Sequence, residues 1–422
     1  MSGEEVVLPD TGSPRRTADP ALPAWALDPA VAFLNHGSFG ACPRSVLEAQ
    51  SRWRDRLEAD PVAFLARDLD PLLADARHEL ARFVGSDPDD LVFVPNATAG
   101  VNTVLRSLRF GPGDELLALD HAYNASLNAL RFAAERDGAR VALARVPFPL
   151  EDPDAAVDAV LRAVTPRTRL ALLDHVTSPT ALVLPVAEIV RELGRRGVDT
   201  LVDGAHAPGM VPLDLDAIGA AYYTGNCHKW MCVPKGSAFL RVRRDRQHAI
   251  RPLAISHGAN STRTDVGRYR LEFDWTGTFD PTPWLCIPDA LRAVPAGIAG
   301  GWRGLMDGNR TLALAARDLL ADRLGVEHAA PDAMLGSMAA VRLPGTEAAV
   351  PDLPAAAASL EAAVVARRIE APVVAWPSPW LLQSGDLPRG AVGSLYVRVS
   401  AQRYNRIEEY DRLADVLVGA LR

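Results

Sequence analysis

Short runs of consecutive apolar residues recur through the first part of the chain. They occupy positions 91–94, 115–119, 141–144, 170–173, 200–202 and 237–240. A strand that helices cover on both faces is apolar throughout, whereas a strand with one exposed face alternates apolar and polar residues. Stretches with a helical pattern separate the runs. The pattern therefore predicts an α/β fold with a mostly parallel sheet between layers of helices.

Apolar residues also recur at helical spacing before the first run, at 46–57 and, beyond Pro71, at 72–83. The first part of the chain is different, because residues 1–25 are polar, contain several prolines and show no period. We expect a flexible N-terminal tail over 1–25, followed by a folded segment that begins near Phe33.

The composition and the apolar pattern of the sequence change after about Pro288. Helical sequence rich in Ala and Leu is followed by extended pieces at 339–343 and 394–399, and by a last helical pattern at 407–416. We therefore predict a large domain over 26–290, whose N-terminal segment contacts a smaller α+β domain over 291–422.

Composition and charge exclude several classes of protein. The formal charge of −7 provides no basic face for nucleic acid or an anionic membrane, and Arg243, Arg244 and Arg246 are explained as a solvated strand end. The four cysteines lack the spacing of a zinc site or a disulfide framework. No run approaches the ~20 apolar residues of a membrane helix, and we find no signal peptide. We expect a cytoplasmic protein with reduced thiols and no metal.

Polar side chains follow the apolar runs directly, at Asn96, His121, His175, Asp203 and His206. Open α/β sheets bind their ligands outside the carboxyl ends of their strands. These side chains are therefore expected to gather at one ligand-binding edge of the sheet.

The segment 95–102 lies between an apolar run and a helical stretch, so its backbone N–H groups would face an anion at a helix N-terminus. That arrangement predicts a phosphate site. An ordinary cap by Asn96 or Thr98 explains the local sequence about equally well.

Lys229 follows a short segment that begins at Tyr222, and Asp203 ends an apolar run upstream. Trp230 and Met231 would desolvate the amine and leave it uncharged and nucleophilic. An aspartate that keeps a pyridinium nitrogen protonated, with a lysine that forms a Schiff base, is the pairing that pyridoxal phosphate chemistry requires. Alone, Asp203 would be interpreted as a cap and Lys229 as a surface lysine.

Arg398 lies inside an apolar run, where a charge needs a partner. A substrate carboxylate held in a bidentate manner would be such a partner. An internal salt bridge is the competing explanation.

Four motifs together, 96–98, 203–206, 226–229 and 275–278, resemble the class V aminotransferase superfamily of fold-type-I pyridoxal phosphate enzymes. Segments 33–40 and 225–230 look most like its isopenicillin N epimerase-like and carbon–sulfur lyase branch. The resemblance runs from about Phe33 to the C-terminus. It implies a large domain with a mostly parallel, seven-stranded type of sheet and a smaller α+β C-terminal domain.

The resemblance also implies the roles of individual residues. Lys229 would carry the cofactor and move the Cα proton, Asp203 would hold the ring nitrogen, and His206 would lie near the phenolic oxygen. Either Tyr123 or His121 would stack on the ring, and we favour Tyr123. The other residues implied for the cofactor are Ala97, Thr98, Ser178, Asn226 and His228, and those implied for the substrate are Asn35, His36 and Arg398. A neighbouring chain of a homodimer would supply Gly277 and Thr278.

Several reactions can start from this site. We favour a carbon–sulfur lyase that acts on a cysteine conjugate in secondary metabolism, such as antibiotic biosynthesis. An epimerase with Tyr123 or His121 as second acid, and a decarboxylating oxidative deaminase, remain open. A persulfide mechanism is not expected, because no cysteine follows Cys286. A non-catalytic binding protein of the same fold is the alternative from another class. The distal part of the amino-acid substrate is expected near His36, 257–260 and 376–380.

Overall fold

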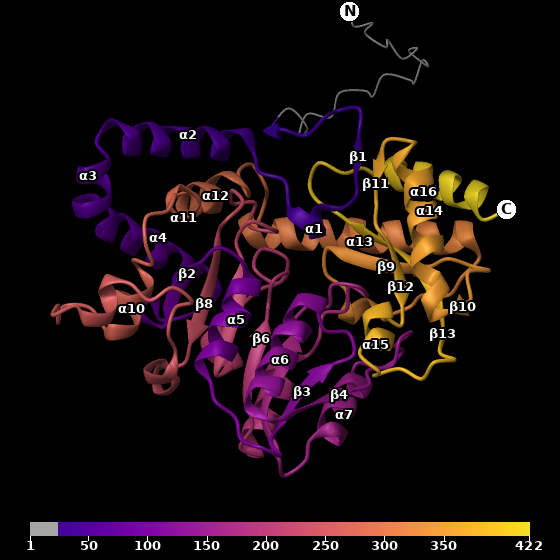
Figure 1. Ribbon diagram of the computed structural model, residues 1–422. Helices are drawn as coiled ribbons and strands as arrows, with labels where there is room; N and C mark the ends of the chain where they lie inside the picture. Colours follow the sequence, from indigo (N-terminus) through magenta and orange to yellow (C-terminus); the bar gives the residue numbers. More distant parts are fainter. Residues whose placement is uncertain (1–23) are drawn as a thin grey trace, which may run out of the picture.

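The computed structural model describes residues 24–422. Its centre is a seven-stranded sheet in the order β2-β8-β7-β6-β5-β3-β4 (Figure 1). Of these seven strands, β8 is the one that runs antiparallel to its neighbours. The strands are β2 (Leu91–Val94), β3 (Glu115–Leu119), β4 (Arg140–Ala144), β5 (Thr168–Asp174), β6 (Asp199–Asp203), β7 (Tyr222–Asn226) and β8 (Ala238–Val242). The predicted α/β fold is confirmed.

Helices cover both faces of this sheet, which explains why its strands are apolar throughout. Along β3, Leu116 and Ala118 belong to one apolar cluster, and Leu117 and Leu119 belong to another. The first cluster includes residues of α5 (Ala97–Ser107), α6 (Asn124–Asp137) and α10 (Arg268–Phe273). The second includes residues of α7 (Asp154–Ala163) and α8 (Val186–Arg195).

The part of the chain before β2 is mostly helical. It contains α1 (His36–Phe39), α2 (Arg44–Ala59), α3 (Pro61–Ala63) and α4 (Leu69–Val84). The two predicted helical stretches correspond to α2 and α4. The tail predicted over 1–25 lies almost entirely outside the described residues. Trp25, its last residue, is buried and packs edge-on against Tyr404.

The C-terminal part builds a second, four-stranded sheet from β9 (Met338–Arg342), β10 (Ala348–Ala349), β12 (Val373–Trp376) and β13 (Val392–Ser400). The helices around it are α13 (Gly301–Leu324), α14 (Leu353–Val365), α15 (Pro379–Gln383) and α16 (Ile407–Ala420). Three short helices lie earlier in the chain, α9 (Leu215–Ile218), α11 (Thr282–Leu285) and α12 (Ile287–Ala293).

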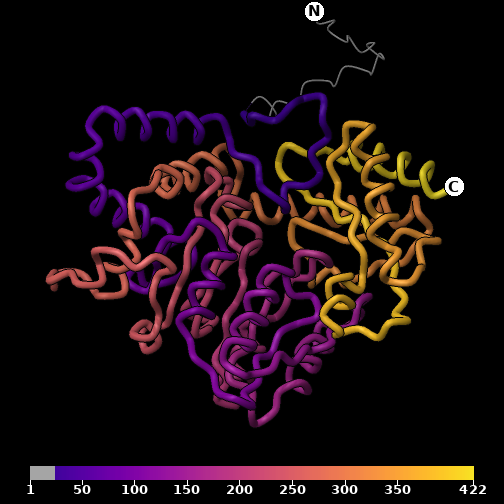
Figure 2. Tube along the Cα trace, in the orientation of Figure 1, coloured from indigo at the N-terminus to yellow at the C-terminus, as the bar shows by residue number. Residues whose placement is uncertain are grey.

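The N-terminal segment joins the two parts of the molecule. Strand β1 (Ala32–Phe33) pairs in parallel with β11 (Ile369–Glu370), so β1 lies beside the C-terminal part of the chain (Figure 2). Immediately after β1, helix α1 reaches the centre of the molecule.

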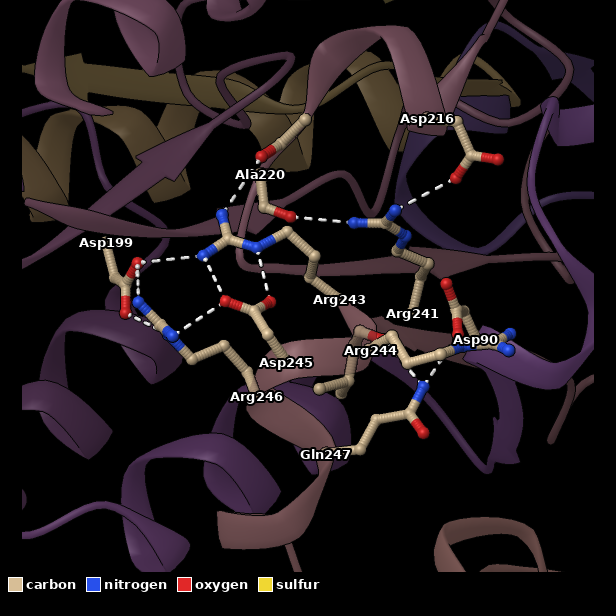
Figure 3. A network of polar contacts seen from close by, with 12 residues as sticks. Asp90, Asp199, Asp216, Ala220, Arg241, Arg243, Arg244, Asp245, Arg246 and Gln247 are labelled. Carbon is tan, nitrogen blue, oxygen red and sulfur yellow. Dashed lines mark hydrogen bonds and ion pairs between the residues drawn. The ribbon is translucent and has the colours of Figure 1, made fainter. Parts of the chain in front are cut away.

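The basic cluster at the end of β8 forms a network of ion pairs (Figure 3). Arg246 lies 2.6 Å from Asp199, Arg243 lies 2.6 Å from Asp245, and Arg244 lies 3.0 Å from Asp90. Neighbouring aspartates therefore offset these charges, and the cluster offers no bare cationic face. No helix within residues 24–422 is both long and apolar enough to cross a membrane.

Candidate functional site

A cavity of about 160 Å³ lies where β5 and β6 end and α5 begins. It brings together most of the residues that the sequence singled out. Its lining is Ser38, Phe39, Asn96, Ala97, Thr98, Tyr123, Asp174, Val176, Ser178, Asp203, Ala205, His206, Asn226, His228 and Lys229.

Lys229 lies shortly after β7, and its amine projects into this cavity beside His206. The Lys229 Nζ atom lies 3.1 Å from His206 Nε2, and Trp230 Nε1 lies 3.5 Å from His206 Nδ1. Because the indole N–H can only donate, His206 Nδ1 accepts and Nε2 carries the ring proton, which faces the amine. Burial, followed by the charge of Arg398, lowers the pKa of Lys229 to about 7. A large fraction of the amine is therefore uncharged near neutral pH.

Two carboxyl groups lie side by side at the ends of β5 and β6. Asp174 and Asp203 are register partners in the sheet, and both are almost fully buried. Asp203 accepts hydrogen bonds from Ser126 Oγ (2.7 Å) and from the N–H of Ala205 (3.1 Å). Burial raises the pKa of both carboxyls, and the charge of Asp203 raises that of Asp174 further. The pair therefore retains a proton that an exposed pair would release.

The N-terminus of α5 points at the same cavity. The Asn96 side chain caps the helix by accepting from the N–H of Ala99, and the N–H of Ala97 donates to Asn226 Oδ1 at 2.8 Å. The cap by Asn96 therefore leaves Thr98, at the second helical position, among the residues that line the cavity. Because the N–H of Ala97 is already engaged, Thr98 is better placed than Ala97 to bind a phosphate.

Arg398 on β13 is buried behind the cavity wall. It donates to Ser178 O (2.5 Å) and Ser38 Oγ (2.8 Å), and more weakly to Asn35 Oδ1 (3.3 Å). Burial lowers its pKa to about 10, so the guanidinium stays charged at neutral pH. Among the described residues, no carboxylate forms an ion pair with it, so the internal salt bridge considered from the sequence is absent there.

His36 does not line the cavity. Its ring is fully buried, with Nδ1 2.8 Å from Tyr404 Oη and Nε2 3.1 Å from the carbonyl oxygen of Lys229. Gly40 packs just as closely, because a Cβ atom there would lie 2.5 Å from the His228 carbonyl oxygen. The structure therefore places His36 behind the Lys229 backbone and outside the lining of the described cavity.

The two candidates for the ring-stacking residue lie in different places. Tyr123 lines the cavity and is 44% exposed. His121 is fully buried, bonds Thr180 and the carbonyl oxygen of Val146, and packs on Trp376. Of the two, only Tyr123 lines the described cavity.

Of the other residues that the resemblance implies for the cofactor, some line the cavity and some do not. His228 lines the cavity, burial lowers the pKa of its ring to about 4, and its Nδ1 has no partner among the described residues. Gly277 and Thr278 do not line the cavity of their own chain, and Thr278 is exposed.

Three residues of the site were not singled out from the sequence: Asp174, Ser126 and Ser38. Asp174 directly follows the apolar run 170–173, so the rule for strand ends could have found it. Ser126 and Ser38 give no such signal, because their partners, Asp203 and Arg398, are distant in the chain.

Comparisons with known proteins show which family the chain belongs to. The family model described as aminotransferase class-V matches residues 41–275. An isopenicillin N epimerase from Streptomyces clavuligerus is 38% identical over 93% of this chain and 95% of its own. A probable chloroplastic L-cysteine desulfhydrase from Arabidopsis thaliana is 33% identical over 94% and 84%, respectively. The cysteine desulfurase CsdA from Escherichia coli shares the fold, with a TM-score of 0.74 at 22% identity over 95% of this chain and 96% of that one.

The family model covers more than half of the chain, and both curated relatives match it over nearly its whole length. The family predicted from the motifs is confirmed, and the interpretation as a non-catalytic binding protein is set aside. The chain belongs to the class V aminotransferase family of pyridoxal phosphate-dependent enzymes.

Proposed function

We propose that the protein is a carbon–sulfur lyase that converts a cysteine conjugate and water into a thiol, pyruvate and ammonia. The observation that carries the proposal is the buried amine of Lys229, which lies in one cavity with the Asp203 carboxyl and close to Arg398, and whose pKa burial lowers to about 7. The desulfhydrase relatives, by their names, act on a carbon–sulfur bond of cysteine.

The residues of the cavity suit pyridoxal phosphate. Three buried polar atoms around it lack a partner among the described residues: Asp174 Oδ2, His228 Nδ1 and Arg398 Nε. Buried polar atoms are normally hydrogen-bonded. Three unpaired atoms around one cavity therefore indicate that a polar ligand completes the site. Thr98 and His228 would hold the phosphate, Asp203 the ring nitrogen and His206 the phenolic oxygen, while Tyr123 and Ser178 would flank the ring.

Each protein group then has a defined task. When bound, the cofactor supplies an electron sink for the pair left behind as a bond to Cα breaks. Arg398, whose Nε has no partner among the described residues, holds the substrate carboxylate and so orients the Cα–H bond. The Lys229 amine removes the Cα proton, which requires the uncharged form that its lowered pKa provides. The electrons of the Cβ–S bond leave with sulfur as the thiolate.

An epimerase is the second candidate, because the relatives from Streptomyces clavuligerus and Amycolatopsis lactamdurans are isopenicillin N epimerases by name. Epimerisation needs an acid on the ring face opposite to Lys229, and Tyr123 is the group that could serve. Because Arg398 would retain the carboxylate rather than release it, we do not propose the decarboxylating deamination.

The purified holoenzyme should absorb visible light through the cofactor bound to Lys229, and Lys229→Ala should remove that band. Incubation with an S-alkyl-cysteine in deuterated water should yield pyruvate without inverted substrate, measured by a coupled assay and chiral chromatography. Recovered substrate that is inverted and deuterated, without pyruvate, would replace the lyase by the epimerase. Lys235→Arg is a suitable control, because Lys235 does not line the cavity and arginine can still donate to the carbonyl oxygen of Gly40.

We further propose a homodimer in which Gly277 and Thr278 reach the phosphate of the neighbouring site. The exposed position of Thr278 outside its own cavity supports this arrangement. The four cysteines are free and buried, which supports the proposed cytoplasmic location.

A further inference from the structure

A second cavity, of about 530 Å³, adjoins the one that holds Lys229. Tyr123 and Ser178 line both cavities, so they form a shared wall. Arg398 also lines the second cavity, while its guanidinium bonds Ser38 and Ser178 of the first. A substrate whose carboxylate is bound by Arg398 therefore has this second space within reach of its side chain.

The chemistry of the second cavity is mostly apolar. Helices α6, α14 and α15 and strand β12 build it. Its apolar side chains include Ala357, Val373, Val374, Ala375, Pro379 and Trp380. Among the described residues that line it, Arg398 is the only one with a formal charge.

We propose that this cavity binds the distal group of the substrate, and that this group is bulky, neutral and largely apolar. The inference rests on the proposed function, which places the amino-acid part of the substrate at Lys229 and Arg398. For a cysteine conjugate, the distal group is an alkyl or aryl substituent on sulfur, so free cysteine would leave the cavity unfilled.

Two physical arguments select this class of group. Burying an apolar substituent against apolar walls is favourable in proportion to the area removed from water. A charged substituent would lose its hydration without an opposite charge in return, because Arg398 is committed to the α-carboxylate. Two buried polar atoms of residues in the lining, Trp380 Nε1 and Asn124 Oδ1, lack a partner among the described residues, which leaves one donor for an oxygen and one acceptor for a hydroxyl or N–H group.

Binding can be measured without any elimination, by titrating the holoenzyme with amino acids that lack a leaving group. The change in cofactor absorbance reports the affinity for L-alanine, L-norleucine and L-phenylalanine. Each buried methylene should tighten binding about fourfold, so norleucine should bind at least roughly tenfold tighter than alanine. L-Glutamate and L-lysine should bind no more tightly than L-alanine.

Two pairs of variants locate the effect. Asn128→Trp obstructs the mouth of the cavity, and Glu135→Trp is its control, because both residues are exposed on α6 and only Asn128 lines the cavity. Ala357→Leu fills the cavity from α14, and Ala358→Leu is its exposed control on the same helix. Both cavity variants should reduce the preference for norleucine to about threefold or less and leave alanine binding unchanged.

Equal affinity for alanine and norleucine in the unmodified holoenzyme would overturn the proposal. A preference for norleucine that all four variants retain would overturn it as well. Absence of pyruvate from every cysteine conjugate would instead refute the lyase and leave the assignment of the cavity intact, because the titration does not depend on bond cleavage.

Discussion

At the scale of single residues, the pairing of Asp174 with Asp203 is the main unusual feature of the site. Two buried carboxyls on neighbouring strands repel each other when both are ionised, and one oxygen of Asp174 has no partner among the described residues. Such a pair costs stability in the absence of ligand, and this cost is typical of functional sites. A cationic ring nitrogen against Asp203 would offset it.

We predict that Asp174→Asn stabilises the cofactor-free protein at pH 8. A carboxyl whose pKa is raised by folding keeps a proton that the unfolded chain releases, so it destabilises the fold increasingly as pH rises above its ordinary pKa of 3.8. The amide can still accept from the N–H of Tyr123. The increase in the free energy of unfolding should be on the order of 1–3 kcal/mol at pH 8 and should vanish near pH 4, as measured by urea unfolding.

Asp114→Asn is the matched control, because its pKa shift has the opposite sign. A backbone hydrogen bond from Gly111 lowers the pKa of Asp114, so this carboxylate stabilises the fold above pH 3.8 and loses that effect in acid. The control variant should therefore be less stable than the unmodified protein at pH 8. Loss of stability in Asp174→Asn at pH 8 would contradict the proposed repulsion.

At the scale of elements, the apolar runs predicted six of the seven strands of the large sheet, because a strand buried on both faces needs no other signal. Strand β7 was missed. It contains Thr224, Gly225 and Asn226, residues that are not typical of a buried strand, and Gly225 and Asn226 are depleted in strands generally. Its place between β6 and β8 makes it a strand, and the Thr224 hydroxyl is satisfied by the carbonyl of Phe239.

The contact between α1 and the Lys229 backbone leads to a prediction at this scale. Gly40 has a φ of +63°, and a Cβ atom there would lie 2.5 Å from the His228 carbonyl oxygen. Gly40→Ala should therefore lose about 2–4 kcal/mol of unfolding free energy, from backbone strain and overpacking together. It should also release the cofactor faster on dialysis, since the backbone that carries Lys229 must shift.

Gly113→Ala separates strain from contact. Gly113 has a φ of +87°, but no atom lies within 4 Å of an added Cβ. This control should lose only about 1 kcal/mol and retain its cofactor. If the two variants behave alike, the approach of α1 does not position Lys229.

At the scale of the whole molecule, the segment that contains β1 and α1 connects the C-terminal part to Lys229. Strand β1 pairs with β11, and α1, which follows it, lies against Lys229. The segment around α10 extends from the side of the large sheet opposite to the C-terminal part (Figure 1). Gly277 and Thr278 follow this helix closely in the sequence. That placement suits a segment that serves a neighbouring chain.

Mixing two inactive variants tests the shared site. Lys229→Ala removes the amine of its own site, and Thr278→Asp would repel the phosphate in the neighbouring one. Refolded together in equal amounts, they should regain about a quarter of the unmodified activity, because half of the dimers are mixed and each has one intact site. Activity in Thr278→Asp alone, or no recovery on mixing, would rule out the proposed contribution of Thr278 across the dimer.

The sequence by itself determined the α/β class, the family and the pairing of Lys229 with Asp203, because burial patterns and short motifs are written locally along the chain. Only the tertiary structure decided that Tyr123 rather than His121 lines the cavity and that His36 lies behind Lys229. It also decided that Asp174 stands beside Asp203 and that a second cavity adjoins the first. These residues are far apart in the sequence. Strand order and side-chain packing bring them together, and no local pattern in the sequence encodes either.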